Sequence, residues 1–299
     1  MKEQVQDTLL RLIKLFISMG FYLLSRAGNM IRSMRGETPP GVCVAVHYHD
    51  VAPRHRARFA RQMNILMHYA KPIAADHKEP LLPGHRYAAL TFDDGFMSAI
   101  ENAVPELVKR KIPATLFIPA GLLGTVPQWT EFGLDSVGNE IIAPAEMLLE
   151  LPSDLITIGS HTMTHPWLPS LSEADAKIEL SASRAELEKA LNRDITLFSF
   201  PYGAFNEGLI ELCREIGYER VFTVQPMLAF SDPLEFVTGR IAVNPTDWEL
   251  EFRLKILGAY QWLPRVSAWK RNLIGKQLHE SPGASNGKKG IRSARYGLN

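Results

Sequence analysis

The sequence predicts an α/β fold built on a parallel sheet. Seven short apolar runs recur between residues 42 and 243, and segments with helical periodicity separate them. The runs are continuous rather than alternating, which is typical of strands buried on both faces of a parallel sheet. With 299 residues, 46% hydrophobic and 22% charged, the chain can bury a sizeable core as one large domain or two ordinary ones.

The predicted strands are residues 42–47, 87–92, 114–119, 155–159, 196–200, 220–224 and 237–243. Helix start signals stand between them: Ser172 with Asp175 resembles a capping box, and Asn206 begins a helix that Gly217 can end. Thr246 opens a third helix. Periodicity alone does not distinguish a closed barrel from an open sheet.

The first 36 residues predict an amphipathic helix. Residues 9–25 are apolar except for a narrow polar stripe at helical spacing, made of Arg11, Lys14, Ser18 and Ser25. The uninterrupted apolar part, 15–24, is shorter than the roughly 20 residues that span a bilayer. We therefore expect a helix lying in the membrane interface, with Arg26, Arg32 and Arg35 near the headgroups. The alternatives are a signal peptide, which lacks a clear cleavage site here, and packing on the protein's own body.

Charge is unevenly distributed along the chain. Residues 1–36 hold six Lys/Arg and two acidic residues, and residues 264–299 hold eight and one. The middle is acidic, with a net charge of −10. Basic ends around an acidic body predict contact with an anionic membrane, and the absence of a nucleic-acid module argues against nucleic acid. We expect a peripheral protein on the cytoplasmic face, with an exported form left open.

The chain divides into a helix at 1–36, a domain at 41–263 and a basic, partly disordered tail at 264–299. An insertion at 121–152 carries Trp129, and long loops of this kind usually shape a substrate site. Cys43 and Cys213 both fall in apolar patterns and are expected in the core as free thiols. Such thiols are compatible with a reducing compartment.

Two motifs indicate chemistry. Asp93 and Asp94 end the second apolar run, where paired carboxylates require a cation, a shared proton or solvent. His161 and His165 are four residues apart, so on a helical turn both imidazoles face one way. With one carboxylate they make a three-ligand set that leaves a position open for water, the pattern of a catalytic zinc.

Three segments occur in a fixed order: Thr91-Phe92-Asp93-Asp94-Gly95, Ser160-His161-Thr162-Met163-Thr164-His165 and Phe200-Pro201-Tyr202-Gly203. Together they resemble the polysaccharide deacetylases, carbohydrate esterase family 4, over about residues 42–243. The resemblance implies a distorted seven-stranded (β/α) barrel, in which function gathers at the carboxyl ends of the strands.

The resemblance also implies the role of each residue. Asp94, His161 and His165 would bind one divalent ion, expected to be Zn²⁺, and Asp93 would be the general base. The metal-bound hydroxide would attack an N-acetyl carbonyl, with the metal and the backbone N–H of Tyr202 stabilising the oxyanion.

Two departures from the family pattern concern His49 and Arg240. No late L-x-H motif follows Arg240, but the segment 47–51 resembles the Y-H-D opening of a circularly permuted branch that acts on poly-N-acetylglucosamine. His49 is therefore assigned as general acid, with His47 as the competing candidate. Ser199 stands where the family often has an Arg that holds the base, and Arg240 is the expected replacement.

The sequence thus predicts a metal-dependent hydrolase that removes N-acetyl groups from a polysaccharide or a lipid-linked saccharide at a membrane. Two alternatives stay open. An O-acetyl carbohydrate esterase could use the same fold, and a carbohydrate-binding relative could retain the motifs with impaired catalysis. The oligomeric state is not predicted.

Overall fold

The computed structural model describes residues 2–128 and 140–263. The predictions for Trp129 in the insertion and for the basic tail at 264–299 lie outside these residues.

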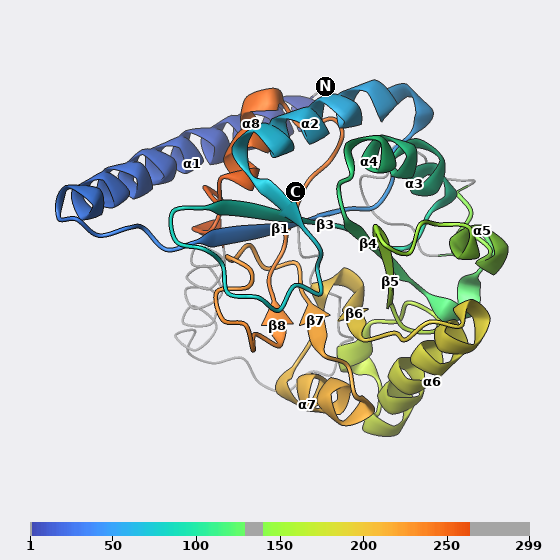
Figure 1. Ribbon diagram of the computed structural model, residues 1–299. Helices are drawn as coiled ribbons and strands as arrows, with labels where there is room; N and C mark the ends of the chain where they lie inside the picture. Colours follow the sequence, from blue (N-terminus) through green and yellow to red (C-terminus); the bar gives the residue numbers. More distant parts are fainter. Residues whose placement is uncertain (1, 129–139, 264–299) are drawn as a thin grey trace, which may run out of the picture.

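The fold is centred on one curled sheet (Figure 1). Its strands are β1 (Val42–Tyr48), β2 (Lys71–Ile73), β3 (Arg86–Phe92), β4 (Ala114–Ile118), β5 (Ile156–Ser160), β6 (Leu197–Ser199), β7 (Arg220–Phe222), β8 (Val237–Thr238) and β9 (Ile241–Ala242). They are ordered β8-β7-β6-β5-β4-β3-β1-β9, every pair along this order is parallel, and β2 pairs beside β3. Because β8 and β9 are consecutive in the chain, the two ends of the order meet, as the predicted distorted barrel requires.

The strand predictions fail in two places. The last predicted strand, 237–243, is two short strands: β8 pairs with β7, whereas β9 pairs with β1. Gly239 and Arg240 form the break between them. The other difference is β2, a three-residue edge strand that contains Pro72 and is too short to give a periodic signal.

Helices cover the outside of the sheet. They are α2 (Arg56–Tyr69), α3 (Met97–Asn102), α4 (Val104–Arg110), α5 (Ala145–Leu149), α6 (Glu173–Leu191), α7 (Glu207–Ile216) and α8 (Glu249–Ile256). Short 3-10 turns lie between them, at Pro53–His55, Ala120–Leu122, Leu168–Ser170 and Pro201–Gly203.

The helix caps agree with the sequence in two of three cases. The side chains of Ser172 and Asn206 accept hydrogen bonds from the first turns of α6 and α7, and Gly217 ends α7 with φ 92°. The start signal at Thr246 is wrong by two residues, because Trp248 is the N-cap of α8. Thr246 instead bonds the side chain of Asn244 in the preceding loop.

Side chains from alternate strand positions fill two separate cores. Val44, Val46 and Tyr48 belong to the large cluster with the buried faces of the helices. Cys43 and Ala45 belong to a smaller cluster with Phe117 and Phe222. Since successive side chains alternate across a strand, the smaller cluster is the interior of the curled sheet. Both cysteines are free and buried, as expected.

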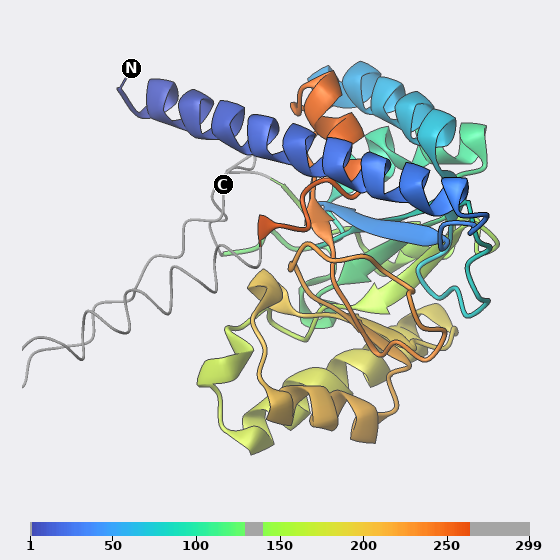
Figure 2. The same ribbon diagram turned by 90° about the vertical axis from the view of Figure 1, so that its left-hand side faces the viewer.

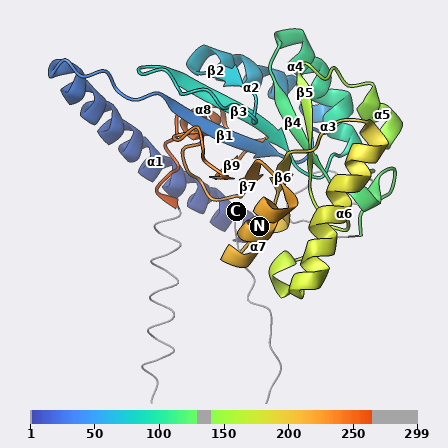
Figure 3. The same cartoon turned by 60° about the horizontal axis from the view of Figure 1, so that its bottom comes forward.

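The helix α1 (Lys2–Met34) lies along one flank of the barrel (Figures 2 and 3). In Figure 2, β1 lies beneath α1 and runs antiparallel to it. The part Thr8–Met34 is long and apolar enough to cross a membrane by length and composition, a criterion that signal sequences and core helices also meet.

Candidate metal and catalytic site

The two adjacent carboxylates occupy a sharp turn after β3. Asp94 and Gly95 both have left-handed backbone conformations, with φ 68° and 64°. The positive φ of Gly95 favours glycine, and any Cβ there would also displace Cδ1 of Ile118, which would lie 2.2 Å away. The turn therefore places the two carboxylates in different clusters. Asp94 lies with His161 and His165, and Asp93 lies with His47 and His49.

The first group has the geometry of a metal site. The ligand atoms of Asp94, His161 and His165 lie within 4.8 Å of one another. Oδ1 of Asp94 is 3.6 Å from Nε2 of His161 and 3.5 Å from Nε2 of His165. In a tetrahedral site with bonds of about 2.0–2.1 Å, neighbouring ligand atoms are about 3.4 Å apart. The observed separations therefore suit an ion between the three side chains.

The protonation states of the histidines also fit a metal. Burial lowers the pKa of His161 to about 4, although Asp93 opposes the shift, and burial together with His161 lowers the pKa of His165 to about 2. Both imidazoles are thus neutral at pH 7, the form that binds metal. Nδ1 of His161 lies 2.7 Å from the backbone oxygen of Ser199 and donates to it in the tautomer that leaves Nε2 facing Asp94.

The prediction that His161 and His165 lie on a helical turn is wrong. They lie in a loop after β5, in which Thr162 and His165 have φ of 69° and 60°. The Thr162 hydroxyl bonds the His161 carbonyl oxygen and accepts from the backbone N–H of His165 at 3.0 Å. Left-handed residues, rather than helical spacing, therefore bring the two imidazoles together.

Glu179 of α6 holds this loop from outside. Its carboxylate accepts hydrogen bonds from the backbone N–H groups of Met163 and Thr164, at 2.9 and 3.0 Å, and from the Thr164 hydroxyl at 2.7 Å. The sequence analysis did not identify Glu179, because nothing in the spacing of a helix indicates which loop its carboxylate reaches.

In the second group, Arg240 binds Asp93 in a bidentate ion pair. Nη1 donates to Oδ1 and Nη2 to Oδ2, each at 2.7 Å, and Arg240 is fully buried. Burial raises the pKa of the Asp93 carboxyl, but the charge and hydrogen bonds of Arg240 outweigh it and hold that pKa well below its usual range. Asp93 is therefore a fixed carboxylate.

Arg240 reaches Asp93 through the interior of the barrel. Its guanidinium also donates to the hydroxyls of Thr91 and Ser199, at 2.9 and 2.7 Å, and lies above the ring of Phe117. A Cβ on Gly239 would lie 2.3 Å from the backbone oxygen of Gln225, so the chain passes this point only with glycine. The side chain of Ser199 is small enough to leave room for the guanidinium, and its hydroxyl accepts a hydrogen bond from it.

His47 and His49 lie beside Asp93 at the end of β1. Their rings contact edge to face, with centroids 5.5 Å apart. His47 is buried, and burial followed by the charge of Arg240 lowers its pKa well below the ordinary value. His49 is half-buried, and one of its ring nitrogens lies within 4.8 Å of a carboxylate oxygen of Asp93.

Tyr202 lies beside the cluster of Asp94, His161 and His165. It follows β6 in a 3-10 turn with φ 58°, and its ring packs against His165 with centroids 4.6 Å apart. Trp167, which is 47% exposed, lies next to Tyr202 at 5.7 Å. Trp167 follows the His165-Pro166 step, a position that the sequence analysis passed over in favour of Trp129.

Fold and site together define a curled parallel α/β barrel with a two-histidine, one-carboxylate group beside an arginine-bound aspartate. The family model described as polysaccharide deacetylase matches residues 83–221, which include Asp93, Asp94, His161, His165 and Tyr202. The polysaccharide deacetylases are therefore the family that this chain resembles in motifs and in fold.

Individual relatives agree with this assignment. The chain is 26% identical over 163 residues to YxkH of Bacillus subtilis, whose name places it in the same family, covering 54% of this chain and 53% of that protein. It is 24% identical over 163 residues to the poly-beta-1,6-N-acetyl-D-glucosamine N-deacetylase of Staphylococcus aureus, covering 54% and 55%. The chain therefore spans about half the length of these curated relatives.

Among solved structures, IcaB from Ammonifex degensii superposes with a TM-score of 0.61 at 26% identity. The match covers 75% of this chain and 98% of IcaB. It therefore extends beyond the segment 83–221 that carries the family motifs.

Proposed function

We propose that the protein is a metal-dependent de-N-acetylase of an N-acetylated polysaccharide. The observation that carries the proposal is the division of the Asp93-Asp94 pair: one carboxylate faces two neutral imidazoles, and its neighbour is held as a carboxylate by Arg240. This arrangement supports a metal ligand set beside an oriented base, the two components of metal-assisted amide hydrolysis.

Asp94, His161 and His165 are the residues that hold the ion, expected to be Zn²⁺. A divalent ion at such a site supplies Lewis-acid activation of a water, bringing its pKa near 7, and stabilises negative charge on an acyl oxygen. Glu179 and the Ser199 carbonyl oxygen keep the two imidazoles in position.

Asp93 is the general base. Its low pKa makes it a weak base, so its contribution depends on orientation: two hydrogen bonds from Arg240 fix the carboxylate plane beside the ligand set. Arg240 is a positioning residue, because it acts through Asp93.

His49 is the general acid for the leaving amine. An amine expelled without a proton is a very poor leaving group, so N-deacetylation requires a donor near the acyl group. His49 is half-buried and can touch a substrate, whereas His47 is buried. We assign His47 a supporting role, packing against the His49 ring.

The proposed substrate is a polymer of N-acetylglucosamine. The name of the Staphylococcus aureus relative gives a poly-beta-1,6-N-acetyl-D-glucosamine, and two adjacent partly exposed aromatic rings, Tyr202 and Trp167, offer a platform for a sugar ring beside the ligand set. The backbone N–H of Tyr202 is proposed as an oxyanion donor.

The test is acetate release from β-1,6-linked N-acetylglucosamine oligomers. We expect activity in the metal-loaded protein, loss with a chelator, and recovery on adding zinc. Asp93→Asn should retain zinc and lose nearly all turnover, whereas His161→Ala should lose both. Equal metal loss in the two variants would contradict the assigned roles, and release only from O-acetylated sugars would indicate the esterase.

A further inference from the structure

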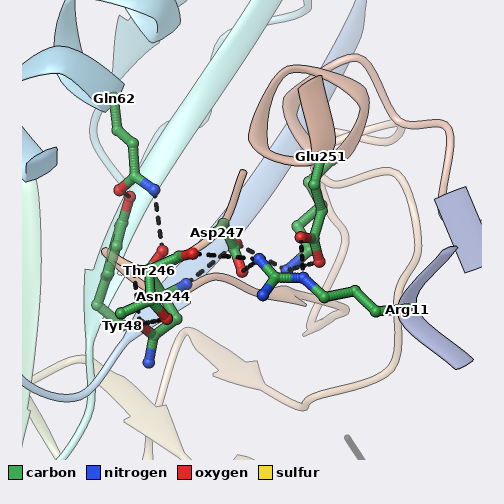
Figure 4. Close-up of polar contacts among 8 residues, drawn as sticks. Arg11, Tyr48, Gln62, Asn244, Thr246, Asp247 and Glu251 are labelled. Atoms are coloured by element: carbon green, nitrogen blue, oxygen red, sulfur yellow. Dashed lines mark hydrogen bonds and ion pairs between the residues drawn. The ribbon is translucent and has the colours of Figure 1, made fainter. Parts of the chain in front are cut away.

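The side of α1 that packs on the barrel is mixed: Leu15, Met19 and Tyr22 pack against the core, and polar residues bond beside them. Nε of Arg11 on α1 donates to the carboxylate of Glu251 on α8. Nη2 of Arg11 donates to the backbone oxygen of Thr246 at 3.1 Å (Figure 4). Two turns further on, the buried Ser18 hydroxyl accepts from Nε1 of Trp262 at 2.9 Å. Two residues of the predicted polar stripe therefore face the protein.

The opposite side of α1 is apolar and exposed. Leu9, Ile13, Phe16, Leu23, Ile31 and Met34 recur at helical spacing on that side. Phe16 is 76% exposed and Met34 is 77% exposed, although each has a large apolar side chain. An apolar row of this length is typical of an interaction surface.

We infer that this row rests on the surface of an anionic lipid bilayer, with α1 lying in the plane between the membrane and the barrel. Charge selects this occupant over a second copy of the chain. Between residues 8 and 36 every charged residue is basic. Arg11 pairs with Glu251 of the barrel, and the others are Lys14, Arg26, Arg32 and Arg35. Two copies of α1 would bring like charges together, whereas anionic headgroups are complementary.

This arrangement also orients the site. Arg11 contacts the segment that follows β9, at the carboxyl edge of the sheet, while the other end of α1 leads back to the start of β1. In Figure 2, β1 runs antiparallel to α1. With α1 in the membrane plane, the barrel would therefore lie on its side and its carboxyl edge would open along the membrane surface. If the proposed function holds, the substrate is a glycan chain running along that surface.

The test is flotation of the full-length protein with vesicles. We expect binding to vesicles of phosphatidylcholine with about 30% phosphatidylglycerol. The double variant Phe16→Glu/Leu23→Glu should have a partition coefficient about tenfold lower. The matched control is Ile178→Glu on α6, also an exposed apolar side chain, which should bind like the wild type. Replacing Arg26, Arg32 and Arg35 by Gln should weaken binding by about fivefold per charge, only with the anionic lipid.

Three results would overturn the inference. The first is that the Glu double variant floats like the wild type. The second is that alkaline carbonate fails to extract the protein, which indicates a spanning helix. The third is that the wild type does not bind vesicles and forms a dimer, whereas the double variant is a monomer. Hydrolysis of soluble oligomers should be unchanged in the double variant. Failure of the proposed function would leave flotation intact, so the two failures are distinguishable.

Discussion

At the scale of single residues, Arg240 defines the candidate active site. Arg240→Lys keeps the charge but loses one of the two hydrogen bonds to Asp93, and Arg240→Gln loses the charge as well. We expect kcat to fall by about 10²-fold in the Lys variant and further in the Gln variant, with zinc content unchanged. Parallel assays of kcat, KM and bound zinc test this.

The matched control is Arg220→Lys. Arg220 is also a buried arginine, but its guanidinium donates to the backbone oxygens of Ala75, His77 and Glu235 instead of a carboxylate. This variant should lose thermal stability and retain kcat. Comparable loss of kcat in both variants would show that Arg240 serves packing rather than the orientation of Asp93.

His49→Ala tests the general acid. A positioned acid typically contributes about 10²–10⁴-fold, so hydrolysis of an N-acetyl sugar should slow by that factor. An activated O-acetyl ester, whose leaving group needs little protonation, should lose much less. Zinc affinity should stay constant, because His49 is outside the ligand set. If His47→Ala shows this pattern and His49→Ala does not, the acid is His47.

Trp167→Ala tests the sugar platform. Removing an exposed ring that contacts substrate but not the reacting atoms should raise KM for long oligomers about tenfold and leave kcat nearly unchanged. The comparison is Trp248→Ala, another partly exposed indole, which contacts Arg11 away from the site. Equal KM values for wild type and Trp167→Ala would remove this residue from the substrate site.

At the scale of elements, the loop between β5 and α6 depends on Glu179. Glu179→Ala removes three hydrogen bonds from the segment that presents His161 and His165. Changes in such supporting contacts cost about 10–100-fold in metal affinity, which zinc titration against a competing chelator measures. Glu173→Ala on the exposed first turn of the same helix should not alter it. An unchanged affinity in Glu179→Ala would mean that the loop keeps its shape without α6.

The elements also show what the sequence could predict. Six of the seven strands were found because continuous apolar runs mark buried parallel strands. The motifs at strand ends also pointed to side chains that the structure brings together in two clusters. The loop at 161–165 was misread because Thr162 and His165 adopt left-handed conformations without the glycine that normally signals them. The break at Gly239 and Arg240 follows from a change of strand partner, a tertiary contact that leaves no local pattern.

At the scale of the whole molecule, the buried histidines make stability depend on pH. His161 and His165 have pKa values of about 4 and 2 in the folded metal-free protein and about 6.5 when unfolded. Between pH 6.5 and 4 the unfolded chain therefore binds more protons, so the free energy of unfolding falls as pH falls. Urea unfolding of the chelated protein at pH 7.5, 6 and 5 measures the decrease.

His161→Ala provides the comparison for this prediction. It removes one of the groups with a lowered pKa, so the decrease between pH 7.5 and 5 should be smaller than in the wild type. A wild-type free energy that stays constant over this range would show that the imidazoles are not buried as neutral groups.

The divided last strand has a consequence for how the chain folds. Asp93 and Arg240 are 147 positions apart, and Arg240 reaches its place only when β9 pairs with β1. Contacts between distant parts of a chain carry the largest loop-closure cost and tend to slow folding. The candidate ligand set and the groups that hold it come from residues 94–199, so all of them precede the last strands in the chain. The Asp93–Arg240 pair would then be the part of the candidate site that forms at the final closing step.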